Sequence, residues 1–157
     1  MTVITHMQRK SRLAEMIDKP GGVSVGVALA QAKANLAVLE DQARTIVADN
    51  IAALLAEPLP GMIEPMRLDM AYSASSQIID AASPFEMDDL CTAAKGLCDL
   101  LDAAPRQGGF DWRIATVHAQ AMKVLLSLPP QEAAARSAIL TNLHEVLKRK
   151  LPGQPQG

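Results

Sequence analysis

Aromatic residues are scarce in this 157-residue chain: they make up 3% of it, whereas 49% of its residues are hydrophobic. Alanine, leucine and methionine must therefore supply most of the core. These residues lose little conformational freedom on entering a helix, while the aromatic and β-branched residues that favour strands are few. The composition predicts an all-helical protein whose length fits one domain.

An excess of positive charge is also absent. The formal net charge is -2, so the chain has no broad basic surface for a phosphate backbone, and we expect no nucleic-acid partner. No apolar run approaches the roughly 20 residues that cross a bilayer. Glu15 and Asp18 precede the apolar run 23–30 and argue against a signal peptide. We therefore expect a cytoplasmic protein without membrane contact.

Residues that commonly carry chemistry are few and scattered. Cys91 and Cys98 lie seven residues apart on one predicted helix, about 10 Å from each other, which is too far for a disulfide and fits a structural role in a reducing compartment. His6, His118 and His144 occur at unrelated spacings, and none has a glutamate three residues before it. We expect no metal and no cofactor. No nucleophile-elbow motif is present, so an enzymatic role is not favoured.

Proline and glycine divide the chain into three parts. Residues 1–22 are predicted to be a flexible N-terminal segment, because Lys19-Pro20-Gly21-Gly22 breaks any regular structure. Residues 23–151 are predicted to form a single helical-bundle domain, and residues 152–157 a disordered tail. We therefore expect any function to reside in the single domain 23–151.

About five helices are predicted within that body, and they differ in length. The first covers 23–57 without a proline and would be about 50 Å long. The second covers 65–82, and its candidate inward positions at three-four spacing, with Ile79 beside them, are Leu68, Ala71, Ser75, Ile78 and Ala82. The third begins with Ser83 as N-cap and Pro84 as its first residue, and Glu86 completes a capping box. Gly96 falls on its polar side, and its apolar stripe is Met87, Leu90, Cys91, Ala94, Leu97, Cys98 and Leu101. Asp111 caps the fourth, and the last lies between Pro130 and Leu151. Amphipathic helices joined by short loops favour an antiparallel bundle.

The long helix carries an apolar seam that its own chain is too short to cover. A 50 Å helix exceeds the roughly 27–33 Å of the later helices, so either it kinks near Gly26 or Asn50 or part of it meets another copy. We expect the second, in a homodimer through residues 23–57. Asn50 occupies the seam, where a buried amide can fix register. The seam positions follow three-four spacing: Leu29, Ala32, Leu36, Leu39, Ala43, Ile46, Asn50 and Ala53.

His118 is the candidate site residue. Successive rotations of 100° place it near the middle of the apolar face of the fourth helix, beside Ile114 and Met122. A core histidine bonded to a neighbouring carbonyl is the structural interpretation. The alternative interpretation is a phosphoryl acceptor.

The stretch Val117-His118-Ala119-Gln120-Ala121-Met122-Lys123 is loosely similar to the site of histidine phosphotransfer proteins. Those proteins are small four-helix bundles, and the resemblance implies His118 as phosphoacceptor and a receiver domain or kinase as partner. The pattern departs from the family, because Lys123 follows the histidine by five residues and no glycine comes next.

A second likeness covers Asp89 to Leu125, including Leu97-Cys98-Asp99-Leu100-Leu101-Asp102 and Asp111-Trp112. This stretch resembles small all-helical alphaproteobacterial proteins of chemotaxis and two-component signalling, which implies a regulatory context. The sequence therefore predicts a non-enzymatic interaction or regulatory module in such signalling. The alternatives are phosphotransfer through His118 and a small-molecule-binding bundle, the latter suggested by eight methionines and two thiols.

Overall fold

The computed structural model describes residues 21–22, 24–105 and 109–150, and the chain divides into two compact units, 1–38 and 39–157. The predicted tail 152–157 lies outside the described residues, as does the predicted flexible segment apart from Gly21 and Gly22.

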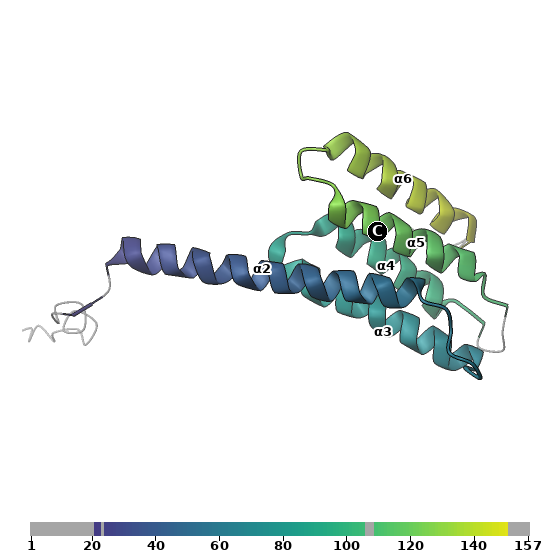
Figure 1. Ribbon diagram of the computed structural model, residues 1–157. Coiled ribbons are helices and arrows are strands. Elements are labelled where there is room, and N and C mark those ends of the chain that lie inside the picture. Colours follow the sequence, from purple (N-terminus) through teal and green to yellow (C-terminus); the bar gives the residue numbers. More distant parts are fainter. Residues whose placement is uncertain (1–20, 23, 106–108, 151–157) are drawn as a thin grey trace, which may run out of the picture. The chain divides into compact units, whose positions relative to one another are not determined.

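The fold is all-α, as the composition predicts. Within the described residues the structure has five α-helices, one 3-10 helix and no strand, and Figure 1 shows the helices in order along the chain. The elements are α2 (Val25–Leu55), α3 (Glu64–Ala82), η1 (Ser83–Phe85), α4 (Asp88–Asp102), α5 (Trp112–Ser127) and α6 (Ala133–Lys150). No helix among these is both long and apolar enough to span a bilayer.

Helix α4 is the centre of the unit formed by residues 39–157. It packs against α3, α5 and α6, which lie around it in Figure 1. Helix α4 is buried on more than its predicted apolar face. In addition to that stripe, Ala93, Gly96 and Leu100 are buried on other sides of the helix. A helix buried on several sides is the core of its domain. The predicted stripe of α4 is buried at Met87, Leu90, Ala94, Leu97, Cys98 and Leu101 and partly buried at Cys91.

The prediction for α3 is confirmed closely. Its predicted inward residues are all buried, and they include the polar Ser75, whose hydroxyl donates a hydrogen bond to the Ala71 carbonyl at 2.8 Å. This bond within the helix satisfies the hydroxyl without a partner from another helix. The buried set is Leu68, Ala71, Ser75, Ile78 and Ala82.

The capping box predicted at Ser83 is wrong. Helix α3 runs directly into η1, and the Ser83 backbone N–H bonds the carbonyl of Ile79 as the end of α3. Ser83 therefore keeps helical angles and cannot take the extended conformation of an N-cap. The chain reverses instead at Glu86, with φ 55° in the left-handed region, and α4 begins after Met87 without a side-chain cap.

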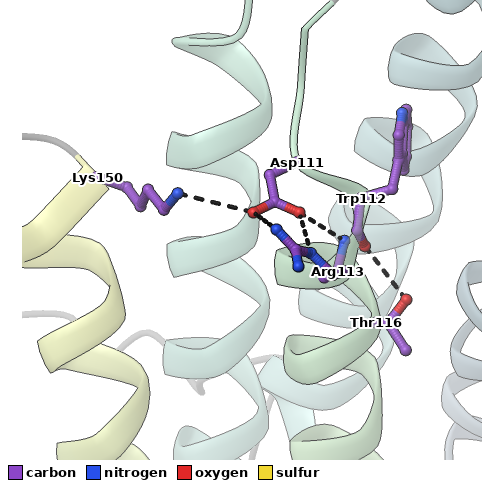
Figure 2. A network of polar contacts seen from close by, with 5 residues as sticks. All are labelled: Asp111, Trp112, Arg113, Thr116 and Lys150. Atoms are coloured by element: carbon purple, nitrogen blue, oxygen red, sulfur yellow. Dashed lines mark hydrogen bonds and ion pairs between the residues drawn. The ribbon is translucent and has the colours of Figure 1, made fainter.

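The cap predicted at Asp111 is confirmed. Its carboxylate accepts the Arg113 backbone N–H at 3.3 Å and the Arg113 Nε–H at 2.9 Å. Figure 2 shows the same carboxylate between Arg113 and Lys150, whose Nζ lies 3.7 Å from Asp111 Oδ2. The hydrogen bonds from Arg113 hold the pKa of the Asp111 carboxyl below its usual value. The ion pair between Lys150 and Asp111 links the end of α6 to the start of α5.

A second polar clamp joins the opposite ends of these helices. The Arg136 guanidinium donates to the carbonyls of Leu125 and Leu128, at 3.0 and 2.8 Å, and to the carboxylate of Asp89. It thereby satisfies carbonyls at the C-terminus of α5, which have no partner within that helix. The clamp fixes α6 against the start of α4.

Candidate functional site

His118 lies in the centre of the bundle with no accessible surface. Its Nδ1 is 2.9 Å from the carbonyl oxygen of Ile114, one turn earlier in α5. A carbonyl can only accept, so this contact assigns the proton to Nδ1 and leaves Nε2 as a lone-pair acceptor. The structural interpretation of a core histidine bonded to a neighbouring carbonyl is confirmed.

The other ring nitrogen has no hydrogen-bond partner among the described residues. Burial lowers the pKa of His118, and the Ile114 carbonyl offsets this only in part. A protonated ring would place a second N–H where nothing accepts it. The folded protein therefore holds His118 in its neutral form.

Gly96 accounts for the space beside the ring. A Cβ added there would lie 3.8 Å from His118 Nε2 and 2.8 Å from Leu147 Cδ1 of α6. The apolar periodicity of the helix predicts Gly96 on its polar side, but the residue is buried. Because Gly96 has no side chain, α4 can approach both Leu147 of α6 and the imidazole of His118 on α5.

The enclosure of the His118 ring does not suit a phosphoryl acceptor. A phosphoryl acceptor must be approached in line by the aspartyl phosphate of its partner, which needs a ring nitrogen at the surface. His118 presents none, since Nδ1 faces its own helix and Nε2 is enclosed. The arrangement favours a structural role, and transfer through His118 stays a prediction without geometric support.

The two cysteines are free and occupy structural positions. Burial raises the pKa of both thiols, helped by the neighbouring carboxylates of Asp88 for Cys91 and Asp99 for Cys98. A raised thiol pKa leaves little thiolate at neutral pH, and thiolate is the reactive and metal-binding form. Within the described residues, no cluster of three or more potential metal ligands occurs.

The cavities of the bundle lie elsewhere. A cleft of about 560 Å³ lies near the Arg136 clamp and is lined by Glu40, Arg44 and Phe85 among others. A smaller cavity of about 230 Å³ lies between α2 and α3. His118 and the two cysteines line neither of them. The small-molecule-binding bundle, which the eight methionines and two thiols suggested, stays a prediction.

Sequence reasoning missed an aromatic cluster at the start of α5. Trp112 donates from Nε1 to Glu64 Oε1 at 3.0 Å, and the Arg67 guanidinium carbon lies 3.6 Å from the centre of its ring. Phe110 meets the same ring edge-on, with ring centres 5.0 Å apart. No local signal links residues about 45 positions apart, so only the fold brings this cluster together.

The feature that stands out is the exposed apolar surface of α2. The helix is uninterrupted, and its buried residues are Ala43, Val47 and Ile51. Ala43 belongs both to the predicted seam and to this core-facing row. The seam has a period of 3.5 and rotates by about 20° per heptad on a helix of 3.6 residues per turn, so its later positions Ile46 and Ala53 lie off the row. The exposed seam residues are Leu29 at 57%, Leu36 at 60%, Leu39 at 51% and Ile46 at 47%, together with Ala32 and Ala53.

Asn50 is half-buried within this seam. Its Nδ2 donates to the carbonyl of Ile46 at 2.9 Å, one turn earlier in the same helix. One N–H of the amide thus has a partner within its own helix. Its predicted part in fixing register between two copies stays a prediction.

Comparisons of the chain with protein-family models, with curated proteins and with solved structures found no match.

Proposed function

We propose that this chain is a non-enzymatic helical interaction module that forms a homodimer through α2. The observation that carries the proposal is the exposure of the α2 seam at Leu29, Leu36, Leu39 and Ile46. Monomeric proteins rarely expose contiguous apolar surface of this kind, and larger patches mark interaction sites.

The composition of the first half of α2 supports the proposal independently. From Val25 to Leu39 only Gln31, Lys33 and Asn35 are polar, and every residue of this stretch is exposed. A helix that is apolar all round is normally buried, because exposing apolar surface to water is unfavourable on every face. A protein partner supplies that burial.

The proposed context is bacterial two-component or chemotaxis signalling. It is supported by the resemblance of Asp89 to Leu125 to small helical proteins of that context, and a receiver domain or kinase is the partner class it suggests. In such a role the α2 dimer presents two copies of the bundle unit 39–157 to the same partner.

Light scattering on the wild-type chain at tens of micromolar tests the dimer. The expected mass is twice the 16.7 kDa of one chain. Leu36→Asp places a charge in the seam and is expected to give the monomer mass. Val117→Asp serves as matched control, because it adds the same charge at an exposed apolar residue of α5. A monomeric wild type refutes the proposal, as does a dimer that Leu36→Asp leaves intact.

A further inference from the structure

The stretch Val25–Leu39, here called the apolar segment, needs cover on more than one side. One partner helix covers a single stripe of it, whereas a groove between two helices covers two. Its twelve apolar or small residues are distributed around the whole helix. Its partner surface must therefore offer more than the single stripe of one helix.

An apolar groove, here called the α2–α3 groove, lies within the unit 39–157. Its walls are the last residues of α2, the connection 56–62 and α3. It encloses about 230 Å³ and is mostly apolar, with two methionines, Met62 and Met70, and the ring of Trp112 in its walls. Methionine is flexible and adapts to an incoming helix, as at other helix-binding grooves. Exposed Leu59, at 67%, lines the same α2–α3 groove.

The orientation of the two copies follows from the seam. In an antiparallel pair of α2 helices centred near residue 41, Leu29 of one copy faces Ala53 of the other, and Leu36 faces Ile46. Ala53 belongs both to the seam and to the wall of the α2–α3 groove. A parallel pair instead sets each residue opposite itself and leaves the groove empty.

We propose that the apolar segment of one copy packs along α2 of a second copy and places side chains near Leu29 in its α2–α3 groove, and the reverse, in an antiparallel two-fold dimer. This inference rests on the proposed self-association through α2. Each copy then contributes the fifteen residues of the segment and the twelve that line the groove. Their total falls within the roughly 20–30 residues per side of a standard interface.

Disulfide trapping tests the orientation. Packed helices have axes about 8–10 Å apart and Cα atoms about 2.3 Å from each axis, so facing residues come within disulfide range. Leu29→Cys and Ala53→Cys chains, mixed and oxidised with oxidised glutathione, are expected to form a mixed dimer. Leu29→Cys alone is expected to form none. The wild-type chain controls for Cys91 and Cys98.

Filling the groove tests the occupant. Ala53→Trp is expected to raise the dissociation constant of the dimer at least about tenfold, whereas Ala138→Trp, at an exposed position of α6, leaves it unchanged. Circular dichroism of both variants confirms that they fold. A dimer that survives Ala53→Trp, or a disulfide between two Leu29→Cys chains, overturns this arrangement while the proposed function stands. A monomeric wild type overturns both.

Discussion

Replacing His118 by leucine is expected to remove a loss of stability that the wild-type protein suffers in mild acid. Burial lowers the pKa of His118 in the folded protein, whereas an unfolded chain has the ordinary value of about 6.5. Below about pH 6.5 the unfolded chain therefore binds a proton that the folded protein does not. The contribution of His118 to stability is complete above that pH and is lost as the pH falls below it.

The size of the effect is limited by one proton per molecule. One proton corresponds to at most about 1.4 kcal/mol of unfolding free energy per pH unit. At neutral pH, leucine fills a similar volume and removes the buried Nε2 that has no partner among the described residues. We expect the free energy of unfolding of His118→Leu to lie within about 1 kcal/mol of the wild-type value. His118→Ala leaves a cavity and is expected to cost about 3 kcal/mol.

Urea unfolding followed by circular dichroism, from about pH 7.5 to about pH 5.5, measures this dependence. The acid loss of stability is expected to be shallower in His118→Leu than in the wild type. His144→Leu is the matched control, because His144 is exposed on α6 and its replacement leaves the buried site intact. An acid dependence that is identical in His118→Leu and the wild type refutes the assignment of a neutral, enclosed imidazole.

Two further substitutions test the packing around α4. Arg136→Met removes the donors to Asp89 and to the carbonyls that end α5, and is expected to lower the free energy of unfolding by about 2 kcal/mol in urea melts. Gly96→Val is expected to cost about 2 kcal/mol, measured as a lower Tm, because its branched side chain meets both Leu147 and His118. Gly96→Ala is the milder comparison, since the tip of Leu147 can shift. Unchanged stability in Arg136→Met or Gly96→Val contradicts the corresponding contact.

The parts of the fold that follow from periodicity were predictable. Residues three and four apart lie on one helix face, which is why the inward positions of α3 and the burial of His118 follow from the sequence. Asp111 was predictable as a cap because a cap bond is local. The bounds of α2, Val25–Leu55, fall within two residues of those predicted, since proline and glycine mark its limits.

Features that depend on neighbours were not predictable. The Ser83 motif matches a capping box, but the end of α3 already uses the backbone N–H of Ser83. Gly96 lies opposite the apolar stripe of α4, yet α6 covers it through Leu147. The contact of Trp112 with Glu64 depends on how the fold brings the start of α5 close to the start of α3. Each of these contacts joins separate elements, which a helical pattern does not specify.

The candidate site was predicted only in part. The carbonyl bond of His118 followed from its place on an apolar face, but the enclosure of Nε2 depends on three helices. The seam of α2 was predicted from its spacing. Ala43 of the seam is buried because it also belongs to the core-facing row with Val47 and Ile51, and spacing alone does not specify which seam residues the rest of the fold covers.

Sedimentation equilibrium of the wild-type chain over a range of concentrations tests the central claim, that α2 provides a self-association surface. The account predicts a mass that rises from 16.7 kDa to twice that value as concentration increases, and a Leu36→Asp chain that stays at 16.7 kDa throughout. A wild-type chain that remains at the monomer mass up to tens of micromolar would contradict it.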